Sequence, residues 1–136
     1  AAIVLPEATQ KRLIAAALNP ALARMKEMQW QGWGNPFELK ITKANCVELG
    51  IPTYFSIVTN PMDLTRMAER LRAFGYSSID EFARDARQIV SNAQSFNAAG
   101  DPVYHCASQF SSLVDNAIVE AQRRLEQLEK SEKRHE

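Results

Sequence analysis

The sequence is poor in the features that mark disulfide scaffolds, zinc sites and membrane spans. Its two cysteines, Cys46 and Cys106, lie far apart without a CxxC motif or a histidine pair beside them. We therefore expect free thiols, which are typical of a reducing compartment, rather than a disulfide. No apolar run approaches the ~18 residues that span a bilayer, and residues 1–5 are too few for a secretory signal. We expect a soluble, intracellular protein without membrane contact.

An excess of charge of either sign is also missing. Lysine plus arginine and aspartate plus glutamate each number 16, so no positive field favours nucleic acid, and we expect no direct sequence-specific nucleic-acid contact. Arg66, Arg70 and Arg72 are expected on the solvated surface. His105 stands beside Cys106 without a third ligand, and no nucleophile is placed beside a base. We therefore expect no enzyme, no cofactor and no metal.

The 136 residues are most simply a single domain, residues 1–136, because a chain of this length buries roughly two thirds of its unfolded surface. The core is expected over residues 9–128, and residues 129–136 are expected to form a frayed, charged helix end. The first residue is not methionine, which suggests a module of a longer protein. We expect the isolated domain to be monomeric.

Apolar residues at helical spacing are abundant, whereas strand alternation between turn signals is missing. Asp63 is a predicted N-cap, and its helix is expected to end near Phe74-Gly75 with the glycine at the C-terminal position. Ser78 with a glutamate three residues later forms a capping box, and Asp101 precedes a proline suited to the first helical position. The predicted helices are 7–30, 64–74, 79–96 and 102–128.

Two interruptions of the helical pattern need interpretation. Asn19-Pro20 falls inside the first helical segment, where the apolar stripe keeps its phase, so we favour one helix kinked at Pro20 over two helices. Residues 30–61 form a loop of about 30 residues, which is long for a compact domain. The loop is far too apolar for a solvated linker. We expect it to fold back against the bundle.

Asn97 stands where the third predicted helix stops. In an up-down bundle the long loop and the turn after Asn97 fall at the same end. The apolar groups there, with the Asn97 amide and the Tyr54 phenol, suit a neutral, slender ligand with one hydrogen-bond acceptor. Taken alone, Asn97 is more simply a helix C-terminal residue in a left-handed conformation.

Three segments in register resemble the bromodomain, the acetyl-lysine reader module. They are PTYFSIVTNPMDL at 52–64, RMAERL at 66–71 and NAQSFN at 92–97, and the resemblance covers residues 9–128. It implies an all-α fold, a left-handed up-down four-helix bundle with a long ordered loop between helices 1 and 2. The helical pattern predicts the same bundle apart from its handedness.

The resemblance also implies roles for individual residues. Asn97 would hydrogen-bond the acetyl carbonyl, Tyr54 would reach that carbonyl through an ordered water, and Val103 would stand at the gatekeeper position. No cofactor is implied other than ordered waters in the pocket. The remaining implied wall residues are Pro36, Phe37, Leu49, Ile51, Ala93 and Phe96, with Trp33, Ile41 and Val47 less firmly aligned.

The function implied by the resemblance is non-catalytic binding of acetylated lysine. The expected partner is an acetylated histone tail or another acetylated protein, in the nucleus, for a chromatin-targeting module of a larger protein in transcription regulation. Asn35 stands where some members carry tryptophan, and together with the small Val103 it suggests an open pocket with altered selectivity. The alternative is a helical protein-interaction module with a vestigial or altered acyl-lysine pocket.

Overall fold

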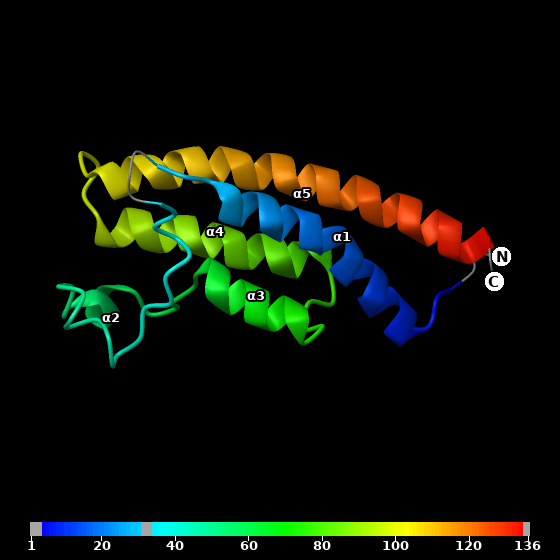
Figure 1. Cartoon of the computed structure of the whole chain (residues 1–136), viewed down its shortest axis with the longest axis horizontal. Helices are drawn as coiled ribbons and strands as arrows, with labels where there is room; N and C mark the ends of the chain where they lie inside the picture. The colour runs from blue at the N-terminus through cyan, green and yellow to red at the C-terminus, as the bar shows by residue number, and fades with distance from the viewer. Residues whose placement is uncertain (1–3, 31–33, 135–136) are drawn as a thin grey trace.

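Helices make up all the regular secondary structure of the described part of the chain, residues 4–30 and 34–134 of a computed structural model. The predicted all-α fold class is confirmed (Figure 1). None of the helices in these residues is long and apolar enough to cross a membrane. In chain order the helices are α1 (Glu7–Glu27), α2 (Tyr54–Ile57), α3 (Leu64–Arg72), α4 (Ile79–Phe96) and α5 (Pro102–Arg134).

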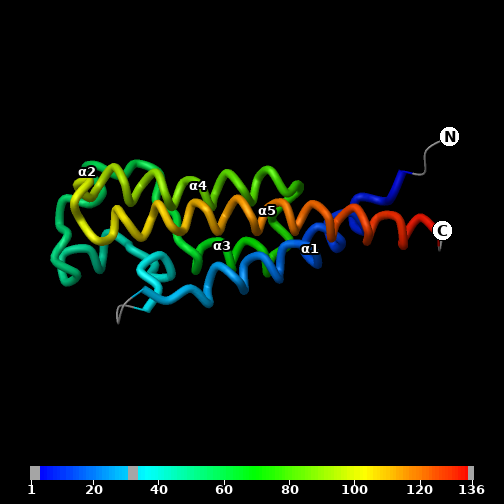
Figure 2. Tube along the Cα trace, turned by 90° about the horizontal axis from the view of Figure 1, so that it is seen from above, coloured from blue at the N-terminus to red at the C-terminus, as the bar shows by residue number. Residues whose placement is uncertain are grey.

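Helices α1 and α5 pack side by side in opposite directions. Gln10 bonds to Glu129 near one end of the pair, and Arg24 bonds to Glu120 nearer the other, so residue numbers rise along one helix as they fall along its neighbour. The two termini therefore lie at one end of the bundle, and the long loop with α2 lies at the opposite end, beside the α4–α5 turn (Figures 1 and 2). This is the predicted up-down arrangement.

Helix α1 passes through Pro20 without interruption, so the prediction of one helix rather than two is confirmed. It ends at Glu27, before the predicted end at Trp30, because Met28 has extended backbone angles of φ −61° and ψ 135°. The Asn35 side-chain Nδ2 donates to the Met25 carbonyl at 2.8 Å. That bond satisfies one of the carbonyls that a helix C-terminus leaves without a partner.

The predicted caps of the three later helices are confirmed. Asp63 accepts from the backbone N–H of Arg66 at 2.6 Å, Ser78 Oγ accepts from that of Glu81 at 3.2 Å, and Asp101 accepts from that of Val103 at 2.9 Å. Each cap is a local interaction within three residues, and for that reason it can be predicted from the sequence.

The predicted end of α3 was wrong in one respect. The residue in the left-handed region is Phe74, with φ 55°, and not Gly75. The glycine is required for a different reason: a Cβ at position 75 would lie 2.8 Å from the Arg70 Cγ and 3.0 Å from the Arg70 carbonyl oxygen. The Gly75 N–H donates to that same carbonyl at 2.8 Å, which closes the helix end.

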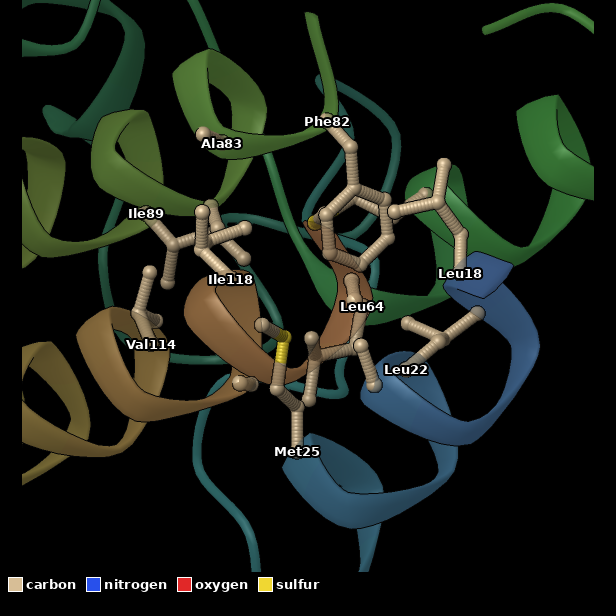
Figure 3. Packing of buried hydrophobic residues seen from close by; sticks show 14 of the residues in the cluster. Leu18, Leu22, Met25, Leu64, Phe82, Ala83, Ile89, Val114 and Ile118 are labelled. Carbon is tan, nitrogen blue, oxygen red and sulfur yellow. The ribbon is translucent and has the colours of Figure 1, made fainter. Parts of the chain in front are cut away.

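The core lies where α1, α3, α4 and α5 meet. Figure 3 shows Leu18 and Met25 of α1 close to Leu64 of α3, with Phe82 of α4 and Val114 of α5 completing the cluster. All five side chains are at most 1 % exposed. Since full burial of such a side chain contributes about 1.5–3 kcal/mol, this cluster supplies much of the stability that holds the four longer helices together.

The long loop has a small apolar cluster of its own. Cys46, Tyr54 and Val58 are buried together, with partly buried apolar residues around them. Residues 54–57 form the one-turn helix α2, which the sequence pattern did not predict. The loop is therefore folded against the bundle, as expected, and both Cys46 and Cys106 are free thiols.

Helix α5 continues as regular helix to Arg134. Glu129 accepts a hydrogen bond from Gln10 at 2.7 Å, and Glu132 pairs with Arg12 at 3.2 Å. These contacts join the segment of α5 after Leu128 to α1.

Candidate functional site

A cavity of about 190 Å³ opens at the loop end of the bundle. The long loop, the start of α3, the last turns of α4 and the first turn of α5 form its walls. Most of the residues assigned to a pocket from the sequence meet here. Those that line the cavity are Pro36, Phe37, Ile41, Ile51, Tyr54, Ala93, Phe96, Asn97 and Val103.

Asn97 is the C-cap of α4 and lines the cavity with its amide. Its backbone is extended, at φ −107° and ψ 145°, and not left-handed. The side-chain Nδ2 donates to the Ala93 carbonyl at 2.8 Å, which fixes the plane of the amide. An amide nitrogen carries two hydrogens and the amide oxygen two lone pairs. One hydrogen and the oxygen are therefore left for a ligand.

Tyr54 stands across the loop cluster with its ring held between two aromatic side chains. The ring centroids lie 5.3 Å from Phe55 and 5.0 Å from Phe96. Within the described residues no polar side-chain atom is both fully buried and unpartnered. Tyr54 lines the cavity, and its hydroxyl makes no hydrogen bond to any of those residues. Burial raises the pKa of this phenol, so it remains a neutral hydrogen-bond donor at physiological pH.

Phe37 forms the apolar floor of the cavity, in contact with the core. It is 5 % exposed, and its ring centroid lies 5.5 Å from that of Trp30 and 4.9 Å from that of Phe110. Trp30 in turn donates from Nε1 to the Gln109 side chain at 2.7 Å. This aromatic group ties the floor of the cavity to α5.

Asn35 does not line the cavity. Its Nδ2 bonds the C-terminal carbonyls of α1, and its Oδ1 accepts from the Phe37 N–H at 3.0 Å. The side chain therefore fixes the start of the loop relative to α1 and holds Phe37 in place. The position before Pro36 thus has a structural use here, and it supplies no aromatic wall.

Three residues assigned to the pocket from the sequence are not placed in it. Leu49 is 43 % exposed and Val47 is 67 % exposed, and neither is in the cavity wall, because Cys46 is the residue of this turn that packs inward. Both assignments are corrected on this point. Trp33 lies outside the described residues.

Several wall residues had no signal in the sequence pattern. Leu39 follows Phe37 at a spacing of two in the loop, Ile89 is a buried apolar residue of α4, and Asn92 is a buried polar residue on α4, 6 % exposed. Asn92 Nδ2 donates to the Asn60 carbonyl at 2.8 Å and so attaches the loop to α4. The remaining unpredicted wall residues are Met62 and Asp63.

Asp63 places a carboxylate in the wall, and Arg66 compensates it. The Arg66 Nη1 donates to Asp63 Oδ2. The Arg66 side chain is 22 % exposed, and the Asp63 side chain is 4 % exposed. Burial raises the pKa of the Asp63 carboxyl, and the N–H groups and charge of Arg66 act in the opposite direction. The expectation that Arg66 is a solvated surface residue was therefore wrong, because it is the partner of a buried acid.

The described residues contain no cluster of three or more histidine, cysteine, aspartate or glutamate side chains that could hold a metal ion. His105 is exposed, next to the buried Cys106. The polar groups of the cavity lining are the amides of Asn92 and Asn97, the Tyr54 phenol and the Asp63 carboxylate paired with Arg66, and the other lining residues are apolar. Such a site is suited to binding a neutral polar group at the end of an apolar chain.

The chain is similar to known proteins over much of its length. A family model described as Bromodomain matches residues 22–109. Transcription factor GTE9 of Arabidopsis thaliana is 33% identical over 99 residues, which are 73% of this chain and 14% of that protein. Transcription factor GTE11 of the same plant is 36% identical over 74 residues, 54% of this chain and 12% of that protein.

A relative from a fungus shows the same partial match. Bromodomain-containing factor 2 of Saccharomyces cerevisiae is 31% identical over 83 residues, which are 61% of this chain and 13% of that protein. In all three relatives the matched stretch is a small part of a much longer protein.

Proposed function

Because this chain belongs to the bromodomain family, we propose that it binds acetylated lysine in peptides and catalyses no reaction. The observation that carries the proposal is the Asn97 amide, which lines the apolar cavity with one hydrogen still free after its bond to the Ala93 carbonyl. An acetyl carbonyl is a neutral acceptor of the right kind for that hydrogen.

In the proposed complex the lysine side chain enters with its acetyl group first. Asn97 donates to the acetyl oxygen, Tyr54 reaches the same oxygen through a water, and the methyl group lies beside Phe37. Unmodified lysine would have to place its ammonium group against mostly apolar walls, at a cost of several kcal/mol. Acetylation removes that charge, so the modified form is the one that binds.

The ligand we propose is an acetylated histone tail, and the location we propose is the nucleus. Support comes from the names of two relatives, which are called transcription factors. Because the matches cover a small part of each relative, we propose that this chain acts as the chromatin-targeting module of a larger protein.

The test is titration calorimetry with acetylated and unmodified histone-tail peptides. Asn97→Ala should lower the affinity for the acetylated peptide at least about tenfold, because a direct hydrogen bond in a partly apolar site is lost. The thermal unfolding transition should stay cooperative. Asn116→Ala, which changes an exposed asparagine of α5, is the matched control and should bind as wild type.

Two results would contradict the proposal. Unchanged affinity in Asn97→Ala would remove the amide from the binding site. A wild-type protein that binds both peptides equally would favour a helical interaction module whose cavity has lost its ligand.

A further inference from the structure

The cavity wall formed by residues 37–41 is laid across the first turn of α3. Phe37, Leu39 and Ile41 alternate along this segment, and all three line the cavity. At the Phe37 end the segment is tied to α3 by backbone, since the Leu64 N–H donates to the Phe37 carbonyl at 2.8 Å. One residue further, the Thr65 hydroxyl donates to the Glu38 carbonyl.

At the Ile41 end the connection to α3 is made by side chains, and the less exposed of them is Arg66. Arg66 Nη2 donates to the Ile41 carbonyl at 2.8 Å, while Nη1 of the same guanidinium donates to Asp63. Asp63 is held in turn by its cap bond to the Arg66 N–H. One planar group therefore connects two residues of the cavity wall, one from the loop and one from the start of α3.

The other polar contacts near Ile41 are more exposed or lie within the loop. Lys40 pairs with Glu69 on α3 at 2.8 Å, but their side chains are 41 % and 50 % exposed, and exposed pairs contribute little. Asn45 Nδ2 donates to the Lys40 carbonyl at 2.9 Å, which is a bond within the loop itself. The Ile41 side chain packs against the cluster of Cys46, Tyr54 and Val58, and among the polar links from residues 40–41 to α3 the bond from Arg66 is the least exposed.

We propose that Arg66 is a positioning residue that limits the length of the acyl group the cavity accepts, by holding Ile41 against α3. The inference rests on the proposed function, because it concerns the same cavity and the same class of ligand. With Ile41 fixed, the wall on the loop side cannot move outward to admit the extra methylene groups of a propionyl or butyryl chain. Released from Arg66, the wall can move, and longer acyl groups fit.

The substitution Arg66→Lys tests the bond to the Ile41 carbonyl separately from the ion pair with Asp63. It keeps a positive charge for Asp63, but a single ammonium on a flexible stem cannot reproduce the planar fork that also reaches the Ile41 carbonyl. Arg66→Lys should therefore preserve most of the stability while releasing the loop, and it remains informative if Arg66→Ala folds poorly.

The experiment compares acetylated and butyrylated versions of one histone-tail peptide by titration calorimetry. Wild type should prefer the acetylated peptide, and in Arg66→Lys and Arg66→Ala the ratio of butyryl to acetyl dissociation constants should fall at least about fivefold, as when a barrier to one or two methylene groups is removed. Arg72→Ala, an exposed arginine of the same helix, is the control and should keep the wild-type ratio.

Hydrogen exchange followed by mass spectrometry gives a second reading that needs no ligand. Amides of residues 39–45 should exchange faster in both Arg66 variants than in wild type and Arg72→Ala, while α5 stays protected. An unchanged acyl ratio, an equal loss of both peptides, or a wild-type ratio in Arg66→Lys would overturn the inference. Failure of the proposed function would appear differently, as wild type that does not distinguish acetylated from unmodified peptide.

Discussion

Two tyrosines at opposite ends of α4 show how differently the two ends of this bundle use their polar groups. Tyr76, in the α3–α4 turn, is 1 % exposed, and its hydroxyl donates to Asp85 at 2.6 Å. Tyr54, beside the cavity, is 8 % exposed, and its hydroxyl bonds to none of the described residues. One phenol is bonded within the fold, and the other is the phenol to which we assign a role in binding.

Polar groups of the α3–α4 turn bond to one another in one network. Arg70 bonds to Glu81 and Asp85 at 3.1 Å each and to the Gly75 carbonyl at 2.9 Å, and its guanidinium lies 4.2 Å from the centre of the Tyr76 ring. Stability and binding should therefore respond to substitutions at different ends of the bundle, and experiments can separate the two properties.

The largest expected effect is on stability, at the closed end. Asp85→Ala removes the acceptor of the buried Tyr76 hydroxyl and one partner of Arg70, and should lower the free energy of unfolding by about 2–3 kcal/mol. Urea denaturation measures this loss. The matched control is Asp115→Ala, whose carboxylate is 65% exposed and pairs with Arg87 at 3.4 Å; it should cost less than about 0.5 kcal/mol.

Affinity for the acetylated peptide should be unaffected in Asp85→Ala below its unfolding temperature. A loss of affinity in step with stability would show that the two ends are coupled, and the comparison would fail.

A smaller effect, with a pH signature, is expected for Tyr76→Phe. The variant loses the bond to Asp85 and should be about 1 kcal/mol less stable than wild type near neutral pH. Burial, and then the bond to Asp85, raise the pKa of Tyr76 above its ordinary value of 10.0. Above about pH 10 the unfolded phenol ionises while the folded one keeps its proton, so wild type loses stability as pH rises.

Tyr76→Phe has no phenol at position 76, so its free energy of unfolding does not show this fall above about pH 10. Urea denaturation from about pH 8 to about pH 11 should therefore show the wild-type advantage shrinking above about pH 10. Parallel curves for the two proteins would contradict the assigned protonation of Tyr76.

The helices could be predicted from the sequence because the features that define them are local. The caps at Asp63, Ser78 and Asp101 act within three residues, and the apolar stripes of the helices follow one period, so helix positions were predictable. Asn97 was located at the end of such a stripe.

The features of the site that the sequence did not predict depend on contacts between segments far apart in the chain. In the sequence Arg66 looks like a surface arginine of a helix, and within the described residues its hydrogen-bond partner from another segment is the Ile41 carbonyl. In the turn before Gly50 no period indicates which residue faces inward, so the sequence could not show that Cys46 packs into the loop cluster while Val47 and Leu49 are exposed. Family resemblance helps there only as far as the loops align.

The smallest effect is expected at the cavity end, where Tyr54→Phe removes a tyrosine hydroxyl as Tyr76→Phe does at the other end. Tyr54→Phe removes a hydroxyl that makes no bond within the described residues, so the free energy of unfolding should change by less than about 0.5 kcal/mol. The free energy of binding to the acetylated peptide should become less favourable by about 1 kcal/mol, as a water-bridged bond to the acetyl oxygen is lost.

Tyr76→Phe is the matched control. It should lower the free energy of unfolding and leave the free energy of binding unchanged. If Tyr54→Phe destabilised the fold as much as Tyr76→Phe does, its hydroxyl would belong to the scaffold, and the cavity would offer a ligand the Asn97 amide alone.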